Sequence, residues 1–375
     1  MKDSGKVSLL RGLSNNVASA NIKLALNNTC PFEENVIAYK LPGETALMTT
    51  SRRKFLDILI GAPLALAGGC ALGREAMSLT RASTPRVTNY NADGSYLITE
   101  GKTLLVGMTF PTPVENLSGS LPTQIEPESA GGAQLSEPQP LFFYPATDGH
   151  TFRTILCAPL DVVEGAYKVH LAGQQEGKEA RWAVNYSIRR GDYYETSLTV
   201  NKNFTEPSPE IAARMRHDFE TMLEIYQRHT PRRWSAPFVQ PVPGPDKDNF
   251  GDKRTYNRTK HSRHSGLDYS AATGTPVRAI NDGVVALSGE QWVSGQTICI
   301  DHGGGLFSKY LHLSERRVRE RDGVKRGDVI GLSGHSGGQK PAPHLHLDLV
   351  HNGVRVDPKD FMRTASQLIT LEAQG

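Results

Sequence analysis

The residues of this sequence best suited to chemistry are histidines near its C-terminal end. Eight of the twelve histidines lie from His261 onward, in under a third of the chain. Two of them occur in the run Pro343-His344-Leu-His346-Leu-Asp348-Leu. Alternate side chains of a strand point to the same face, so His344, His346 and Asp348 would share one face while the leucines enter the core. Two histidines that project together from a rigid strand are well placed to share a metal ion.

Two further motifs could complete such a site. His264-Ser-Gly-Leu-Asp268 places a histidine and a carboxylate four residues apart, and Gly266 favours an extended or turning loop there. Tyr310-Leu-His312 would place its two polar side chains on one strand face. A catalytic zinc site uses three protein ligands plus water, and His264, Asp268 and one histidine of the His-x-His pair supply that set. The histidines left over could take a proton from water and stabilise charge on an attacked carbonyl.

The segments that carry these motifs have the character of β-strands. After Asn249, short β-rich runs alternate with turn dipeptides such as Asp282-Gly283 and Asn352-Gly353. We expect no helix longer than a turn or two before the C-terminus. The pattern predicts a compact antiparallel β domain over residues 236–365.

A second β domain is expected upstream, over residues 91–204. Short strands alternate there with turn residues, which favours an immunoglobulin-like β-sandwich, and residues 117–140 have the composition of a loop. The region carries no constellation of catalytic groups, so positioning or autoinhibition is its expected role. Ser208-Pro209-Glu210 then predicts a helix start, which places a connecting helix within residues 205–235.

The sequence before these domains indicates export. Arg52-Arg53 is followed by an uncharged, mostly apolar run from Ile58 to Gly69, and the combination resembles a twin-arginine signal. As a helix, the apolar run would span roughly 18 Å, too short for a hydrocarbon core of ~30 Å. Residues 48–70 are therefore interpreted as a signal peptide, which predicts a location in the periplasm or cell envelope.

The surrounding boundaries follow from that interpretation. Ala67-Gly68-Gly69-Cys70 resembles a lipoprotein cleavage box, and a lipid on Cys70 would attach the chain to a membrane. Signal peptides begin a protein, so residues 1–47 are interpreted as a spurious upstream extension and Met48 as the true start. Residues 71–90 are expected to be a linker.

Composition narrows the class of protein. With 38% hydrophobic and 22% charged residues, the chain is expected to be globular rather than disordered or membrane-spanning. The formal charge of +3 points to no nucleic-acid partner. Only four cysteines are present, which favours neither a disulfide framework nor a cysteine-rich zinc site.

Taken in order, the three histidine motifs resemble the LytM/lysostaphin-type zinc metallopeptidase family. The resemblance covers roughly residues 250–360 and extends to flanking runs, which are Gly274-Thr-Pro-Val277, Asp282-Gly-Val284, Asp301-His-Gly303 and Val329-Ile-Gly331. It implies a small, mostly antiparallel β fold with a groove for a peptide. The usual substrate of the family is the peptide portion of peptidoglycan, either stem crosslinks or glycine bridges.

The resemblance also implies roles for individual residues. His264, Asp268 and His346 match the ligands of one Zn²⁺ per catalytic domain. His344 and His312 match the two catalytic histidines. We expect His344 to act as general base, and His312 to stabilise the oxyanion formed on the substrate.

Two departures from the family pattern qualify these expectations. The loop before His344 lacks the usual Ser-Thr-Gly-Pro run, which puts substrate preference in doubt. Asp348 stands where a glutamate is common, and it either orients a ligand from behind or is a surface residue.

Two other functions compete with the peptidase. Some relatives keep the fold, lose metal ligands and activate other wall hydrolases without hydrolysing anything themselves. All five expected positions are filled in this chain, which favours the enzyme over such a regulator. A wall-binding lipoprotein with a structural zinc is the second alternative, in which the two non-ligand histidines would have no purpose.

Overall fold

The computed structural model describes residues 36–39, 48–51, 84–90, 95–121, 139–338 and 342–374. The chain divides into two units, Met1–Ala76 and Met77–Gly375. The first unit contains one antiparallel pair, formed by β1 (Val36–Tyr39) and β2 (Met48–Ser51). Cys70 and the rest of the expected signal peptide, together with most of the expected upstream extension and linker, lie outside the described residues.

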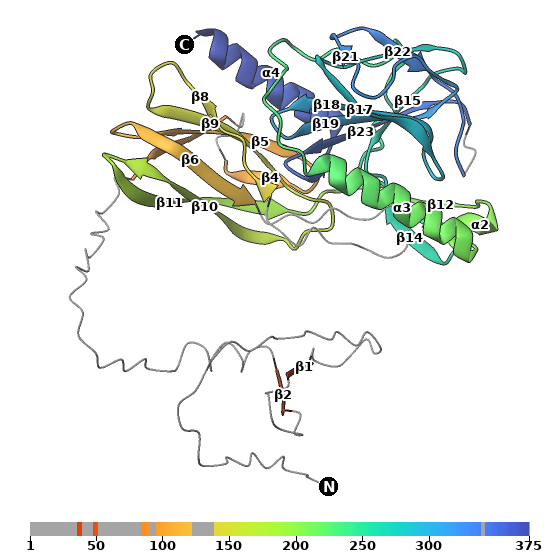
Figure 1. Ribbon diagram of the computed structural model, residues 1–375, viewed down its shortest axis with the longest axis horizontal. Helices are drawn as coiled ribbons and strands as arrows, with labels where there is room; N and C mark the ends of the chain where they lie inside the picture. Colours follow the sequence, from red (N-terminus) through yellow and green to blue (C-terminus); the bar gives the residue numbers. More distant parts are fainter. Residues whose placement is uncertain are drawn as a thin grey trace. The chain divides into compact units, whose positions relative to one another are not determined.

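The second unit begins with two sheets that pack face to face. The first sheet has the order β4 (Leu97–Thr99), β11 (Lys178–Arg189), β10 (Gly165–Gln175), β6 (Val114–Leu121) and β7 (Gln139–Pro140). The second has the order β3 (Arg86–Asn89), β5 (Thr103–Thr109), β9 (Thr151–Cys157) and β8 (Tyr144–Pro145). Buried residues alternate with exposed ones along β11, and its inward side chains share one apolar core with β5 and β9. This sandwich appears in orange, yellow and yellow-green in Figure 1.

The expected strands around Thr103–Phe110 and Trp182–Ile188 are confirmed as β5 and β11. The immunoglobulin-like topology stays a prediction. The loop expected from residue 117 was partly wrong, because β6 continues to Leu121 and pairs with β10 through Ser120 and His170. Ladder hydrogen bonds to β10 keep this Ser- and Gly-rich stretch extended although its composition is typical of a loop.

The connecting helix forms where the sequence predicts it. After the short helix α2 (Lys202–Thr205), α3 spans Pro209–Tyr226. The Ser208 hydroxyl accepts a hydrogen bond from the Ile211 amide, and Pro209 occupies the first turn. The inward face of α3 packs on the following domain through a small core cluster of Met222, Ile225, Tyr226, Ala286, Cys299, Phe307 and Val350.

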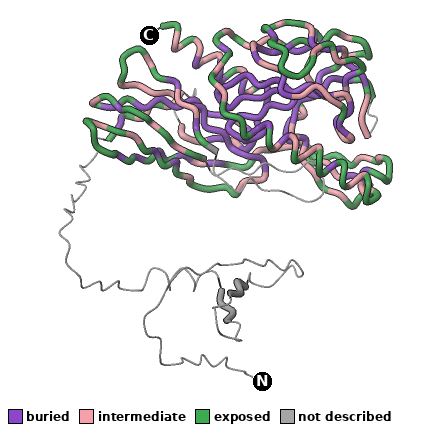
Figure 2. Tube along the Cα trace, in the orientation of Figure 1, coloured by how far each residue is buried: buried purple, intermediate pink, exposed green. Residues whose placement is uncertain are grey.

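The second domain is built on an antiparallel sheet, as the sequence predicts. Its order is β15 (Leu267–Tyr269), β23 (Leu345–His351), β19 (Leu306–Leu313), β18 (Gly295–Gly303), β17 (Gly283–Gln291) and β21 (Gly323–Val324), with β24 (Val354–Val356) also paired to β23. Two smaller sheets flank it: β16 (Pro276–Arg278), β22 (Val329–Leu332) and β20 (Glu315–Arg316), and β12 (Glu195–Leu198), β13 (Lys253–Tyr256) and β14 (Lys260–Arg263). Buried residues concentrate in the strands of the large sheet (Figure 2).

A long C-terminal helix was not expected from the sequence. Helix α4 spans Pro358–Gln374 and contacts β5 and β9 of the sandwich as well as β23 of the large sheet. Phe361, Ala365 and Leu368 are fully buried at helical spacing, so the apolar period was present in the sequence. In the part of the chain that the structure describes, no helix is both long and apolar enough to cross a membrane.

Buried polar contacts join the sandwich to the second domain. Arg263, at the end of β14, lies 3.1 Å from Glu100 and 2.9 Å from Asp161 of the sandwich. The side chains of Arg263 and Glu100 are 8% and 1% exposed. The residue after Arg263 is His264, so the sandwich holds the strand that leads directly into the candidate site.

Candidate metal centre

Two of the expected ligands are brought together by strand pairing. Asp268 on β15 is the direct partner of His346 on β23 in an antiparallel ladder. Residues directly opposite each other in such a ladder project from the same face, with their Cβ atoms about 5 Å apart. The register of these two strands therefore sets the carboxylate beside the imidazole.

The third expected ligand reaches the same point from a loop. His264 follows β14, and its Nδ1 donates a hydrogen bond to the backbone oxygen of Asn249 at 2.7 Å. At Gly266 the loop then passes close to residues 346–348 of β23. A Cβ added to Gly266 would lie only 2.3 Å from His346 Nε2 and 2.5 Å from Asp348 Oδ1. The stretch of chain that links His264 to Asp268 can therefore approach β23 this closely only because residue 266 is glycine.

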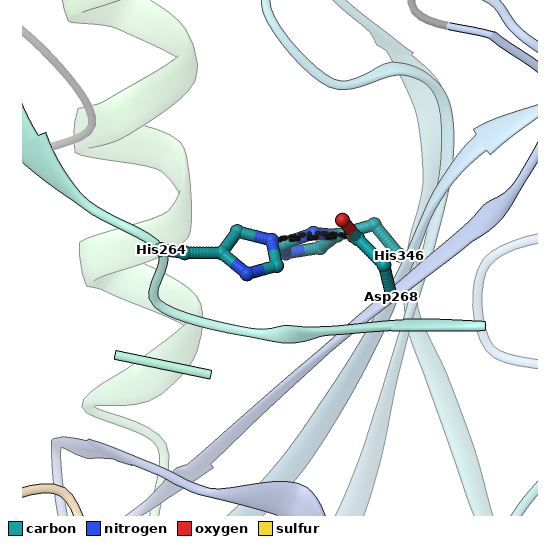
Figure 3. Close-up of side chains that lie close together, drawn as sticks. All are labelled: His264, Asp268 and His346. Atoms are coloured by element: carbon teal, nitrogen blue, oxygen red, sulfur yellow. Dashed lines mark hydrogen bonds and ion pairs between the residues drawn. The ribbon is translucent and has the colours of Figure 1, made fainter. Parts of the chain in front are cut away.

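The donor atoms of the three residues converge on one point. His346 Nδ1 lies 3.0 Å from His264 Nε2 and 2.9 Å from Asp268 Oδ1, and the remaining pair, His264 Nε2 and Asp268 Oδ1, is 3.2 Å apart. Figure 3 shows the three side chains pointing toward one another. Among the residues that the structure describes, these three form a group of histidine and acidic side chains close enough together to share a metal ion.

The chemistry of these donors fits zinc. Two imidazole nitrogens and one carboxylate oxygen are the ligand types of catalytic zinc sites, with bonds of about 2.0–2.2 Å. Tetrahedral bonds of that length separate the donors by roughly 3.3 Å. The three observed separations, 2.9 to 3.2 Å, are slightly shorter, so a zinc ion would need only a small outward movement of the side chains.

The charges of the ligands are set by burial and by each other. Burial alone would raise the pKa of Asp268, but His264 and His346 outweigh it and hold that pKa well below its usual range. Burial lowers the pKa of His264. Burial also opposes charge on His346, yet the Asp348 and Asp268 carboxylates prevail and raise its pKa to about 9. The site therefore favours a positive charge between carboxylates, whether it is carried by a proton or by a metal ion.

The two expected catalytic histidines lie beside this group. His344 directly precedes β23, and its Nε2 is 3.5 Å from Asp268 Oδ1. The rings of His312 and His344 are 5.0 Å apart, and His312 is 6.1 Å from the ring of His346. All five side chains predicted from the sequence are thus brought together in one place.

Each of these two histidines has one nitrogen fixed by a carbonyl. His344 Nδ1 lies 2.7 Å from the Ala342 oxygen, and His312 Nδ1 lies 2.8 Å from the Ser336 oxygen. A carbonyl can only accept, so both Nδ1 atoms carry a proton and both Nε2 atoms are free of one in the neutral rings. Burial lowers the pKa of His344, and burial with the neighbouring histidines lowers that of His312 to about 3. Both rings are therefore neutral at pH 7.

The expectation that Tyr310 and His312 share a strand face was wrong. Tyr310 is fully buried, and its hydroxyl oxygen accepts a hydrogen bond from the Ile280 amide. His312 has a left-handed backbone, with φ of 61°. Such a residue interrupts the alternation of side chains, and it turns His312 out of the core toward the site.

Asp348 is not a surface residue, which excludes one of its two interpretations. It is fully buried, and its Oδ1 lies 2.7 Å from His346 Nε2. Lys309, its direct partner on β19, is also buried. Asp348 therefore contacts a candidate ligand from the side opposite the donor atoms.

Two residues that contact the ligands, Asn249 and Arg254, were not predicted from the sequence. The Asn249 amide donates to Asp268 Oδ2 at 2.8 Å, and Arg254 Nη2 lies 3.5 Å from the same oxygen. Both precede His264 in a polar segment that has no metal-ligand spacing. The only signal was their place just upstream of the motif. The segment that carries Asn249 runs along β15, where the Lys247 amide donates to the Asp268 backbone oxygen, and this long-range pairing decides the contact of Asn249.

An open cavity borders the candidate ligands. It has a volume of about 340 Å³, and Thr196, Leu198, Asn249, Asp252, Arg254, Asp268, His312, His344 and His346 line it. Thr196 and Leu198 belong to β12, which follows the sandwich in sequence. The cavity gives a small group such as a peptide bond access to both the donor atoms and the two neutral histidines.

Comparison with known proteins finds a family whose pattern matches the segment that carries the site. Residues 262–358 match the family described as Peptidase family M23, and all five site residues lie within that match. Peptidoglycan DD-endopeptidase ShyA of Vibrio cholerae is 39% identical over 189 residues, which cover 44% of this chain and 41% of the relative. Peptidoglycan DD-endopeptidase ShyC of the same organism is 35% identical over 127 residues, which cover 34% and 29%. The matched segments span less than half the length of these curated relatives.

A solved structure shares the fold over more of the chain. It is the crystal structure of a Pseudomonas aeruginosa protein assigned to peptidase M23, and it superposes with a TM-score of 0.52 at 23% sequence identity. The superposition covers 71% of this chain and 95% of the other. The common architecture therefore extends beyond residues 262–358 into the upstream part of the chain.

Proposed function

Residues 262–358 form a peptidase family M23 domain, and on this premise we propose that the protein is a zinc-dependent endopeptidase that hydrolyses peptide bonds of bacterial peptidoglycan. The observation that carries the proposal is the convergence of three donor atoms, on His264, Asp268 and His346, beside two neutral histidines. A binding protein with a structural metal would have no use for two uncoordinated imidazoles that line the same open cavity.

The ligands and the metal would divide the chemistry as follows. His264 Nε2, Asp268 Oδ1 and His346 Nδ1 would hold one zinc ion. When bound, zinc supplies a Lewis acid that lowers the pKa of a water molecule to about 7 and polarises a carbonyl group.

The two remaining histidines would move protons. His344 Nε2 faces the cavity without a proton, so it can accept one from a water molecule and return it to the leaving amine. His312 Nε2 is likewise unprotonated in the neutral ring, so it would stabilise an oxyanion on the substrate only after accepting the second proton of the attacking water, which then passes to the amine product. Because His344 Nε2 also lies 3.5 Å from Asp268 Oδ1, a candidate donor atom, His344 is our choice for general base, with His312 as the group that stabilises the developing charge.

The proposed substrate comes from the relatives. Two of them are named peptidoglycan DD-endopeptidases, and each matches this chain at 35% identity or more over the aligned segment. Peptidoglycan lies outside the inner membrane, so we infer that the protein works in the cell envelope. A lipid on Cys70 would keep it at a membrane there.

Purified peptidoglycan tests the proposal directly. The full chain is incubated with it, with and without a chelator, and released muropeptides are analysed by mass. New peptide termini that disappear with chelator and return with added zinc would support the endopeptidase and identify the bond. If a zinc-loaded chain releases no peptide, the proposal is wrong and a non-hydrolytic regulator of wall hydrolases takes its place.

A further inference from the structure

Asn249 contacts two of the three candidate ligands at once. Its backbone oxygen accepts a hydrogen bond from His264 Nδ1 at 2.7 Å. Its side-chain oxygen accepts from the Asp268 amide at 3.1 Å, and its side-chain nitrogen donates to Asp268 Oδ2 at 2.8 Å. The orientation of the Asn249 amide is fixed by its partners, because a backbone N–H can only donate and a carboxylate can only accept.

The two oxygens of Asp268 consequently have different surroundings. Oδ1 faces the imidazole nitrogens, with His346 Nδ1 at 2.9 Å and His264 Nε2 at 3.2 Å. Oδ2 faces the Asn249 amide nitrogen at 2.8 Å and Arg254 Nη2 at 3.5 Å. Amide and guanidinium N–H groups donate hydrogen bonds and do not bind cations, so the side of Oδ2 is closed to a metal ion.

We propose that Asn249 is a positioning residue that, together with Arg254, engages Oδ2 and so leaves Asp268 only Oδ1 to offer to a metal ion. This inference rests on the proposed function, since it requires a metal ion at this site. Catalytic zinc sites take three protein ligands and keep one position for water or substrate. A carboxylate that bound through both oxygens would compete for that position, and Asn249 would prevent it.

The position of Asn249 makes the proposal testable without disrupting the core. The residue is half-buried and lines the open cavity of about 340 Å³, so its truncation leaves no enclosed void. It also lies outside residues 262–358, the segment that matches the family. The inference therefore assigns part of the metal site to the segment upstream of that match.

A purely structural role for Asn249 is the alternative, and Asn257 provides a matched control. Asn257 is also half-buried, and its side chain makes three hydrogen bonds, two with the Val200 backbone and one with the Thr205 hydroxyl. None of these involves a candidate ligand. Its backbone φ of 49° is left-handed, so alanine there adds strain to the lost hydrogen bonds. N257A should therefore destabilise the fold at least as much as N249A.

The experiment compares the full-length wild type, N249A and N257A in three measurements. Zinc affinity is measured by competition with a chromophoric chelator, the visible spectrum is recorded for the cobalt-substituted protein, and thermal unfolding is followed without metal. N249A should bind zinc about 10–100-fold more weakly, as expected when a partner of a metal ligand is removed. Its cobalt absorption should fall in intensity, because a second carboxylate oxygen raises the coordination number. N257A should keep the wild-type affinity and spectrum despite a lower melting temperature.

Each outcome decides the inference. Zinc affinity of N249A within about twofold of wild type, with an unchanged cobalt spectrum, would overturn it while leaving the proposed function intact. If N249A binds zinc more weakly but keeps the wild-type cobalt spectrum, the claim that Asn249 keeps Asp268 Oδ2 off the metal ion is overturned, because only the affinity then depends on Asn249. A wild-type chain that binds no zinc contradicts the proposed function, and the inference fails with it.

Discussion

His346 Nε2 lies 2.7 Å from the Oδ1 atom of Asp348, which is two residues further along the same strand. The side chains alternate along β23, so the two residues project from one face and the carboxylate lies behind the imidazole. Because Nε2 is engaged by Asp348, Nδ1 is the His346 nitrogen that faces His264 and Asp268. A buried acid thus selects which nitrogen of His346 can bind a metal ion.

Removal of the Asp348 charge should weaken metal binding. In D348N the side chain keeps its size, but the buried carboxylate that attracts the His346 N–H is lost. We expect zinc affinity to fall by about 10–100-fold, measured by chelator competition. D301N is the control, because Asp301 is another buried acid of the sheet and contacts Thr230 rather than a ligand. Equal zinc affinities for D348N and D301N would refute the role of Asp348.

Loss of the His344 imidazole should stop turnover without loss of metal. His344 offers no donor atom to the group formed by His264, Asp268 and His346, but its free Nε2 borders the cavity. H344A should lower the rate of peptide release by about 10²–10⁴-fold, the usual contribution of a general acid–base group. The zinc content should stay at the wild-type level. H261A serves as the control, since His261 is exposed on β14 and contacts Thr255.

How far the sequence could predict the site depends on the range of each interaction. The convergence of Asp268 and His346 was predictable because both belong to short motifs that match the ligand pattern of the family, whereas the direct pairing of their strands was not, since strand pairing is a long-range contact. The turn of His312 out of the core was not, because a left-handed residue inside an apolar strand has no sequence mark when it is not glycine or asparagine. Asn249 was missed for a different reason: its contacts depend on the pairing of its own segment with β15, which no local pattern encodes.

The same contrast holds for the fold. The start of α3 was predictable from Ser208 and Pro209, since capping is local. Helix α4 was missed although Phe361 and Leu368 mark its apolar stripe, because the surface that this stripe covers belongs to β5, β9 and β23, which lie elsewhere in the sequence. The contact of α4 with the sandwich strand β5 joins segments more than 250 residues apart, as in the hydrogen bond from Thr103 to Asp360. No local pattern encodes such a contact.

A methyl group at Gly266 should disrupt the ligands. The added Cβ of G266A would meet His346 Nε2 at 2.3 Å, Asp348 Oδ1 at 2.5 Å and the Leu347 backbone oxygen at 2.7 Å. The backbone oxygen cannot swing away, so we expect a loss of about 1–3 kcal/mol in unfolding free energy together with weaker zinc binding. G289A is the control, because the nearest atom to its Cβ is 3.7 Å away. Urea unfolding of both variants checks the prediction, and wild-type stability of G266A would contradict it.

The ion pair between the domains should contribute strongly to stability. In E100Q the buried Arg263 guanidinium keeps only Asp161 as a charged partner. Breaking a buried pair from one side costs about 3–5 kcal/mol, and we expect the lower end because Asp161 remains. The exposed pair of Lys202 and Glu206 is the control, and E206Q should change the unfolding free energy by less than about 0.5 kcal/mol. Similar denaturation midpoints for E100Q and E206Q would show that the pair does not brace the domains.

Stability should fall as the pH drops below about 6.5, in part because of His302. This residue is fully buried on β18, and burial lowers its pKa to about 4, whereas the unfolded chain has the ordinary value near 6.5. Between these two pH values the unfolded state binds a proton at His302 and the folded state does not. The contribution of neutral His302 to the free energy of unfolding is therefore complete above pH 6.5 and is lost progressively down to pH 4. This difference between the folded and unfolded pKa of His302 corresponds to about 3 kcal/mol in the free energy of unfolding.

The H302Q variant isolates this contribution. Glutamine does not titrate, so the unfolding free energy of H302Q should decline less between pH 7 and pH 4.5 than that of the wild type. Buried His351, whose pKa burial lowers to about 3, gives a decline of the same sign that remains in the variant. The two proteins are compared by urea unfolding at matched ionic strength. If the wild type and H302Q lose stability in parallel across this range, His302 is not held neutral by the fold.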